Sequence, residues 1–432
     1  MTEGMRFRNK LAYDLIRGIP QMVGLRTQFV HLYVKDNTEE SGGKFEDYGI
    51  YTQVEQLNKT ALKSHGLDSN GQLYKINSFE FYRYEDIIKK EDDAGYDKTA
   101  FEKMLEIKGD SDHTKLIDML TDLNDYSIGI EDVLKEHFDE ENIVYWMAFQ
   151  ILMGNVDTQN RNVYLYSPLN SDIWYFIAWD NDGCLMRPEY ELRNFSDQNS
   201  WEKGISNYWG NILFQRCLKS RSFREKLNDA ILDLREYLNK DMLTSKIESY
   251  KNVLKPYLYL MPDAEYEPLT SEQYDQIAAS LPDEIEKNYQ LYLESLETPM
   301  PFYIGVPTID GDKLKFNWDV SYDLDAEDIT YSVEVARDYL FRDVIYQNTT
   351  LIVPEAEMDL PEAGQYFVRV RATNTSGKTQ DAFDYYVTDE GKYYGMRCFY
   401  ITEDSTVEED DMKKADRKKE RFVTSGISYQ YQ

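Results

Sequence analysis

The sequence is poor in the residues that build disulfide frameworks and zinc sites. Its only three cysteines, Cys184, Cys217 and Cys398, lie far apart, and no CxxC pair occurs among the 432 residues. A disulfide framework or a cysteine-based zinc site is therefore not expected. The four histidines also lack the spacing of a metal-binding motif.

Long apolar runs and positive charge are scarce as well. No stretch approaches the roughly 20 apolar residues that span a bilayer, and residues 1–20 contain no apolar core of a secretory signal. Acidic residues outnumber basic ones by 79 to 48, which gives a net charge of -31. We therefore expect neither a membrane-spanning segment nor a nucleic-acid partner, because phosphate contacts need a positive face. The acidic surface suits a basic protein partner, bound cations or solubility alone.

The first 298 residues mix helical and strand patterns. Residues 5–18 predict an amphipathic helix, and residues 27–35 and 48–56 predict two paired strands. The pattern is helical from about residue 97 to 154, and residues 141–154 are apolar almost all round, which predicts a buried helix. Residues 163–167 and 173–180 then predict a hairpin, and helical periodicity returns over residues 208–298.

The periodicity changes at Thr298-Pro299-Met300-Pro301, where alternation replaces helical spacing. Short alternating runs at regular intervals predict a small antiparallel β-sandwich over residues 299–401. Two of its segments, FNWDVSYDLDAEDITYSVEVARD with Trp318 and GQYFVRVRATNTSG with Tyr366, resemble strands of fibronectin type III domains. Residues 402–432 carry a run of acids followed by a run of bases and predict a charged, disordered tail.

The stretch most informative about chemistry is GNVDTQNRNVYLYSPLNSDIWYFIAWDNDG, residues 154–183. Asp157 follows the buried helix, Asn162 comes five residues later at the start of the hairpin, and Asp180 and Asp182 follow the second strand. Phosphoryl transfer needs a carboxylate that accepts the proton of the attacking hydroxyl, and amide and carboxylate oxygens that hold Mg²⁺ against the phosphates. The order and spacing of these side chains fit those needs.

Each of these side chains also has an ordinary structural explanation. Asp157 could cap a short turn, Asn162 could be a turn residue, and the segment after Asp180 could be an acidic turn. A calcium loop is rejected, because Cys184 and Leu185 stand where an oxygen ligand and glycine are required. For Asp182 the structural and functional interpretations are equally supported. Lys75 is a basic group near residues 54–57, although a single lysine in a strand is more often solvated.

The combined pattern resembles the spore coat protein H (CotH) kinase family. The Gly-Asn-x-Asp-x4-Asn signature and the following Trp-Asp-x-Asp are both present, and RNKLAYDLIR (8–17), GIYTQVEQLNK (49–59) and NGQLYKI (70–76) are similar to other family segments. The resemblance implies an α+β fold in two parts. An atypical protein-kinase-like domain occupies residues 1–298, with a helical part at 190–298, and the fibronectin-type-III-like sandwich follows.

By the same resemblance, the chain would phosphorylate Ser or Thr on protein substrates such as spore coat or surface proteins, with ATP and Mg²⁺. Asp157 would be the catalytic base, and Asn162, Asp180 and Asp182 would form the metal set, Asp182 either at the ion or hydrogen-bonded to its ligands. The segment beside the adenine would consist of Val54, Glu55, Gln56 and Leu57, acting through backbone groups.

A kinase-like fold normally has phosphate-covering strands and a lysine before its first long helix. Here that helix starts at about residue 5, so we expect those strands either upstream of Met1 or missing from a truncated copy. The alternative function is thus a pseudokinase or a surface interaction protein that binds through its sandwich. A calcium-dependent adhesin is a third hypothesis, which rests only on the acidity and the sandwich. The sandwich favours a spore-coat or cell-surface location.

Overall fold

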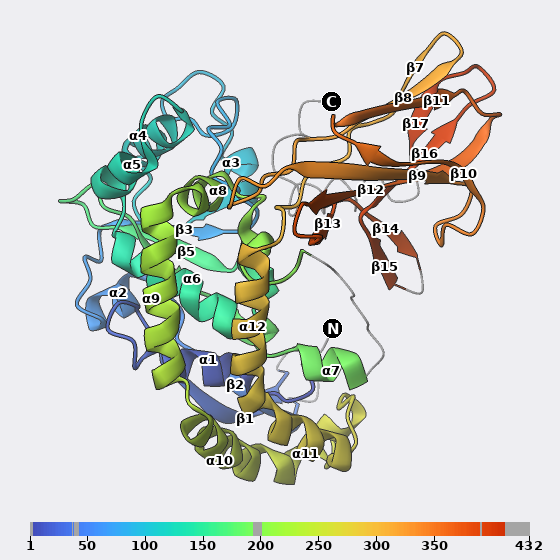
Figure 1. Ribbon diagram of the computed structural model, residues 1–432. Helices are drawn as coiled ribbons and strands as arrows, with labels where there is room; N and C mark the ends of the chain where they lie inside the picture. Colours follow the sequence, from blue (N-terminus) through green and yellow to red (C-terminus); the bar gives the residue numbers. More distant parts are fainter. Residues whose placement is uncertain (1–2, 37, 39–42, 193–200, 389–390, 411–432) are drawn as a thin grey trace. The chain divides into compact units, whose positions relative to one another are not determined.

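The computed structural model describes residues 3–36, 38, 43–192, 201–388 and 391–410 (Figure 1). It mixes helices and strands and divides into two compact units. The first comprises Met1–Asn77, Arg83–Arg193 and Ser220–Tyr289, and the second comprises Ser78–Tyr82, Asn194–Lys219 and Gln290–Gln432.

The first unit contains two antiparallel sheets and most of the helices. Its strands are β1 (Thr27–Lys35), β2 (Phe45–Val54), β3 (Gln72–Ile76), β4 (Leu105–Ile107), β5 (Val163–Ser167) and β6 (Tyr175–Ala178). Strand β1 pairs with β2, and the other four form a sheet in the order β4-β3-β5-β6. Its helices are α1 (Arg8–Ile16), α2 (Lys59–Ser64), α3 (Lys98–Met104), α4 (Thr114–Asn124), α5 (Ile130–His137), α6 (Glu140–Leu152), α7 (Arg187–Leu192), α9 (Arg221–Tyr237), α10 (Lys240–Leu258), α11 (Ser271–Ser280) and the start of α12 (Glu284–Leu296).

The predicted buried helix is α6, and it positions the β5–β6 hairpin. Its N-terminus is capped by the Asp139 carboxylate, which accepts from the Asn142 N–H at 2.9 Å. The Asn142 side chain in turn accepts from Phe176 N–H at 2.6 Å and donates to the Phe176 carbonyl at 3.2 Å. A buried amide satisfied by one residue of β6 fixes that strand against the helix.

The far end of the hairpin is fixed by Lys115. Its ammonium donates to Ser167 Oγ at 3.0 Å and to the carbonyls of Pro168 and Ser171 at 2.7 and 2.8 Å. These bonds hold the connecting loop, so that the opposite end of the hairpin, where Asn162 and Asp180 lie, is carried by a rigid support.

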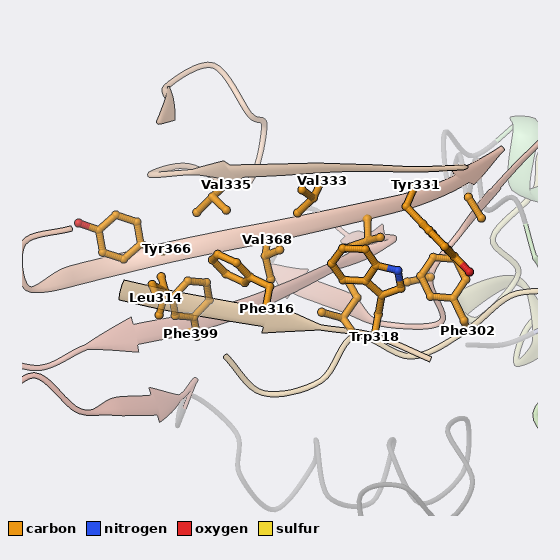
Figure 2. Close-up of a cluster of buried hydrophobic side chains, with 14 of the residues drawn as sticks. Phe302, Leu314, Phe316, Trp318, Tyr331, Val333, Val335, Tyr366, Val368 and Phe399 are labelled. Atoms are coloured by element: carbon orange, nitrogen blue, oxygen red, sulfur yellow. The ribbon is translucent and has the colours of Figure 1, made fainter. Parts of the chain in front are cut away.

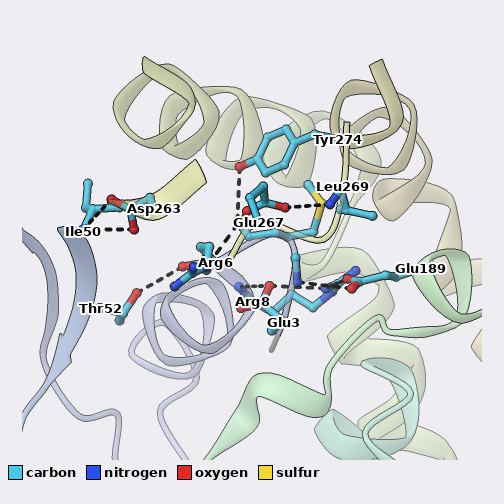
Figure 3. Close-up of polar contacts among 12 residues, drawn as sticks. Glu3, Arg6, Arg8, Ile50, Thr52, Glu189, Asp263, Glu267, Leu269 and Tyr274 are labelled. Atoms are coloured by element: carbon cyan, nitrogen blue, oxygen red, sulfur yellow. Dashed lines mark hydrogen bonds and ion pairs between the residues drawn. The ribbon is translucent and has the colours of Figure 1, made fainter. Parts of the chain in front are cut away.

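Helix α1 is anchored by buried charges (Figure 3). The Arg8 guanidinium, fully buried, pairs with the buried Glu189 of α7 at 2.6 Å and with Glu3 at 3.3 Å. Its Nε also donates to the Leu185 carbonyl at 3.3 Å. An unpaired buried guanidinium would be very costly, so these contacts fix the start of α1 against residues 185–189.

The second unit contains three further sheets, two of which have their buried side chains between them. Its strands are β7 (Thr308–Asp310), β8 (Lys313–Asn317), β9 (Ile329–Ala336), β10 (Val344–Leu351), β11 (Glu355–Asp359), β12 (Gly364–Asn374), β13 (Thr379–Asp381), β14 (Tyr385–Thr388), β15 (Gly391–Tyr394), β16 (Met396–Ile401) and β17 (Val407–Glu409). One sheet has the order β10-β9-β12-β16-β17, with β13 beside β12, and a second has the order β11-β8-β7. In the third, β14 pairs with β15. Helix α8 (Ile212–Lys219) belongs to this unit too.

Figure 2 shows how alternation fills the core of this unit. Phe316 of β8, Val333 of β9, Val368 of β12 and Phe399 of β16 are all buried in one cluster with Trp318. The Tyr366 hydroxyl donates to the Glu362 carbonyl at 2.8 Å, which closes a tyrosine corner of the kind found in immunoglobulin-like sandwiches.

Two predicted boundaries differ from the observed ones. The predicted tail began at residue 402, but β17 (Val407–Glu409) pairs with β16, and residues 411–432 lie outside the described residues. The predicted division fell after residue 298, whereas contacts assign residues 194–219 and 290–298 to the second unit. Independent folding of residues 1–298 and 299–401 stays a prediction.

Candidate functional site

Asp157 lies in a short 3-10 helix, η1 (Val156–Thr158), just after α6. One of its carboxylate oxygens forms an ion pair with the Arg161 guanidinium, and the other accepts from Asn162 Nδ2 at 2.9 Å. Asn162 Nδ2 also donates to the Asp157 backbone carbonyl at 3.1 Å. Asn162 thus orients Asp157 through its NH₂ group, which leaves the amide oxygen as the atom able to bind a cation.

Asp180 follows the last residue of β6 by two positions, and the end of β6 lies beside the start of β5. The Trp179 N–H donates to the Asn162 carbonyl at 3.1 Å, which places Asp180 next to the Asp157–Asn162 pair. Asn162 and Asp180 both have positive φ, 58° and 52°. This left-handed conformation is uncommon outside glycine and is most tolerated by Asn and Asp. Such backbone outliers gather at functional sites.

Helix α1 holds the turn that carries Asp180. The Asp180 N–H donates to the Tyr13 hydroxyl at 3.1 Å, and the Asn181 N–H donates to Asn9 Oδ1 at 3.0 Å. Tyr13 and Asn9 lie one turn apart on one face of α1, since residues i and i+4 are neighbours on a helix. The position of α1 therefore controls the position of Asp180.

A chain of buried amides joins this turn to η1. Asn155 Nδ2 donates to Gln150 Oε1 at 3.0 Å, and Gln150 Nε2 donates to Asn181 Oδ1 at 3.2 Å. Gly183 closes the packing, because a Cβ there would lie 2.6 Å from Asn155 Oδ1 and 3.7 Å from the Asp157 Cβ. The Asp157 turn and the Asp180 turn are thus in direct contact.

The carboxylates at this end of the hairpin repel one another. Burial and the charge of Asp157 raise the pKa of Asp180, and the positive charges of Lys75 and Arg161 only partly offset this. Partial burial, together with Asp180 and Asp157, raises the pKa of Asp182 to about 6, although solvent reaches this side chain. The site carries an excess of negative charge that a cation would relieve.

The oxygen atoms present fit Mg²⁺ in number and type. The Asp180 carboxylate accepts no hydrogen bond from the described residues, so both of its oxygens remain for a ligand. Within the same residues no three His, Cys, Asp or Glu side chains form a ready-made metal group. Mg²⁺ needs none, because it commonly keeps several waters and takes one or two carboxylates plus phosphate oxygens.

The segment predicted to lie beside the adenine, Val54 to Leu57, packs near the hairpin. Leu57 is buried in a cluster with Tyr164 of β5 and Ile177 of β6, and Val54 and Trp179 pack against it. The exposed Gln56 and the half-buried Glu55 complete the segment. Apolar side chains of the segment and of the hairpin thus pack together in one cluster.

Glu55 itself has a structural role. Its N–H donates to the Arg26 carbonyl at 2.8 Å. Partial burial disfavours the charge of its carboxylate, but hydrogen bonds from Arg26 and His65 outweigh this and lower its pKa to about 2. Its side chain therefore holds β1, β2 and α2 together.

Sequence reasoning missed Arg161, Tyr13 and Asn9. Arg161 is inside the signature, one residue before Asn162, where its proximity to Asp157 could have been noticed. Gln150 also gave a signal, because it is a polar residue in a helix that is otherwise apolar almost all round. The contacts of Tyr13 and Asn9 cross more than 160 residues of sequence, and no local pattern reports them.

The family model described as CotH kinase protein matches residues 1–292. The chain belongs to the CotH kinase family. The matched region contains all the candidate residues described above, from α1 to the Asp180 turn, and it ends before the second unit's sandwich strands begin. The resemblance noted in the sequence is thereby confirmed. No curated protein matches the chain.

Membership in the CotH kinase family supports a kinase-like activity for the matched region, residues 1–292. None of the described helices combines the length and the apolar composition that crossing a membrane requires.

Proposed function

We propose that this CotH family member is an atypical protein kinase that transfers the γ-phosphoryl group of ATP to Ser or Thr side chains of protein substrates. The observation that carries the proposal is the convergence of Asp157, Asn162 and Asp180 at one end of the β5–β6 hairpin. Their order along the chain is that of the catalytic loop and the metal aspartate of protein kinases. The first unit would then have a kinase-like fold.

In this proposal each side chain has a distinct role. Asp157 accepts the proton of the substrate hydroxyl, while the hydroxyl oxygen forms a bond to the γ-phosphorus. The bond from that phosphorus to the bridging oxygen breaks, and its electron pair leaves with ADP. Asn162 Oδ1 and the Asp180 carboxylate hold Mg²⁺, and Asp182 supports them from the adjacent turn. Bound Mg²⁺ supplies charge neutralisation of the phosphates.

The adenine would lie against the apolar cluster of Leu57, Tyr164 and Ile177. Such a pocket suits an aromatic base, because ligand sites are mostly apolar with a few placed polar groups. Because the Glu55 N–H is taken by Arg26, contacts to the base would come from other backbone groups of residues 54–57.

The second unit would be a fibronectin-type-III-like sandwich, a proposal supported by the tyrosine corner at Tyr366 and the two-sheet core. Family resemblance favours spore coat or cell-surface proteins as substrates, and the same location for the enzyme. The alternative is a pseudokinase that binds partners through the sandwich.

The test is an assay of Mg²⁺-dependent phosphate transfer from ATP to a generic Ser/Thr-rich protein by the full chain. Asp157→Asn should lower the rate by about 10²- to 10⁴-fold, the usual contribution of a general base, and Asp180→Asn should do likewise by weakening Mg²⁺ binding. Asp172→Asn, an exposed acid in the hairpin loop, is the matched control. Transfer that survives both site variants would refute the assignment. A wild-type chain that binds Mg²⁺-ATP but transfers nothing would establish the pseudokinase.

A further inference from the structure

Two cations lie at the site, and the roles assigned so far use neither. The terminal Nη2 nitrogen of Arg161 forms the ion pair with Asp157. The Arg161 Nε is buried and has no hydrogen-bond partner among the residues that the structure describes. A guanidinium has five N–H donors in a rigid fork, so Arg161 has donors left for a second anion while it remains beside Asp157.

Lys75 reaches the site from the neighbouring strand. It lies on β3 opposite Tyr164 of β5, which lies opposite Ile177 of β6. Residues in one row of a sheet project to the same face, so Lys75 shares the face that carries Tyr164, Ile177 and the Leu57 cluster. One residue further along, Ile76 pairs with Val163, so Lys75 lies at the end of the sheet nearest Asn162.

The environment of Lys75 is unusual for a strand lysine. The other four residues of β3 are buried and Lys75 is half-buried. Its ammonium forms no hydrogen bond or ion pair with the described residues. An ammonium without a protein partner gains a charge-assisted contact from an anionic ligand. The charges of both Lys75 and Arg161 interact with the Asp180 carboxylate, which places both near the proposed metal ligand.

We propose that Lys75 and Arg161 are the phosphate-binding cations of this site, with Arg161 on the transferred phosphoryl group and Lys75 on the phosphates nearer the base. The inference rests on the proposed function. The division of roles follows from position: Arg161 pairs with the base Asp157, whereas Lys75 lies opposite Tyr164 of the apolar cluster. Arginine suits planar, multidentate recognition of a phosphoryl group, and lysine acts as a point charge. Charge fixed on the phosphates stabilises the transition state of transfer.

In this proposal Lys75 contributes mainly to nucleotide binding and Arg161 mainly to the chemical step. Substitutions of the two residues should therefore have different effects. Lys75→Met should weaken ADP and ATP binding by about tenfold, which corresponds to the loss of one charge-assisted contact, and should leave adenosine binding unchanged. Arg161→Met should lower kcat by about 10²-fold or more with little effect on ADP binding. Lys75→Arg and Arg161→Lys should each recover part of the loss. Lys135→Met, an exposed lysine of α5, is the control.

Binding is measured by calorimetry with adenosine, ADP, ATP and Mg²⁺-tripolyphosphate, and folding by thermal unfolding of each variant. Equal loss of adenosine and ADP binding in Lys75→Met would mean that the lysine shapes the pocket, and would overturn its role. Wild-type kinetics in both Met variants, with transfer still dependent on Asp157, would refute the inference and leave the proposed function standing. Tripolyphosphate binding that depends on both cations, in a chain without transfer, would support the inference and refute the proposed function.

Discussion

Three carboxylates face two guanidinium groups where α1 begins (Figure 3). Arg8 pairs with Glu3 and Glu189, and Arg6 lies 4.0 Å from Glu267. Burial raises the pKa of Glu267 to about 7, and the nearby carboxylates add to this, although Arg6 and the Leu269 N–H oppose it. Negative charge is therefore in excess in a region that anchors the helix holding the Asp180 turn.

This excess predicts a pH-dependent stability. The carboxyl of Glu267 has a pKa of about 7 in the folded chain, against an ordinary value of 4.5. Between these values the folded state binds more protons than the unfolded state, so the free energy of unfolding falls as pH rises. Glu267→Gln keeps an acceptor for Leu269 without the charge. It should leave stability near pH 4.5 almost unchanged and raise it at pH 8 by on the order of 1 kcal/mol.

Urea unfolding of the two proteins at pH 4.5, 6 and 8 measures the effect. Glu272→Gln, an acid in the first turn of α11, is a control for the general loss of one negative charge. If Glu267→Gln were less stable than wild type at pH 8, the attraction of Arg6 would outweigh the cost of burial, and the interpretation of this cluster would be wrong.

At the residue scale, the sequence could predict contacts between residues that are close together in the chain. Asp157 and Asn162 are five residues apart, and a turn between a helix and a strand necessarily brings them together. The surroundings of Lys75 could not be predicted in the same way. The sequence favoured a solvated lysine, because the partial burial of Lys75 depends on pairing with β5, almost 90 residues later.

At the scale of elements, the strands were the most predictable part. Strand β1 begins and ends where the alternation predicted it, and β5 likewise, because β-branched and aromatic residues bounded by turn residues mark both. Helix α6 was recognised because it is apolar almost all round. The network from Gln150 through Asn181 to Asn9 could not be predicted, since it joins residues from three elements far apart in the sequence.

Helix α1 should act on catalysis through Tyr13. Its hydroxyl accepts the Asp180 N–H and so helps to hold a left-handed residue in place. Tyr13→Phe removes that acceptor, at a cost of about 1 kcal/mol, and frees the turn that carries the proposed metal ligand. We expect the Mg²⁺ concentration needed for half-maximal transfer to rise severalfold, while the KM for ATP at saturating Mg²⁺ stays constant.

The matched control is Tyr237→Phe, because the Tyr237 hydroxyl donates to the Leu15 carbonyl of the same helix without reaching the turn. Titration of transfer rate against Mg²⁺ at fixed ATP distinguishes the two. Equal behaviour of the two variants would show that α1 contributes only stability.

At the scale of the whole molecule, the change from helical to alternating periodicity indicated where the sandwich strands begin. It did not indicate which earlier residues pack against them. The second unit also contains residues 201–219, whose aromatic side chains join sandwich residues. Trp201 lies 5.1 Å from Phe383 between ring centroids, and Trp209 stacks on Tyr322 at 5.4 Å. The sequence of residues 201–219 carries no sign that they pack against residues more than 100 positions later.

This arrangement predicts which part of the molecule Trp201 stabilises. We expect two calorimetric transitions, one for each unit. Because Trp201 is almost fully buried, Trp201→Ala should lower the stability of the second unit by about 3 kcal/mol or more. It should shift the same transition as Trp318→Ala in the sandwich core, and leave unchanged the transition that Leu227→Ala in α9 shifts. If Trp201→Ala moved the Leu227 transition instead, residues 201–219 would belong energetically to the first unit, and the chain would divide near residue 298 as its sequence suggests.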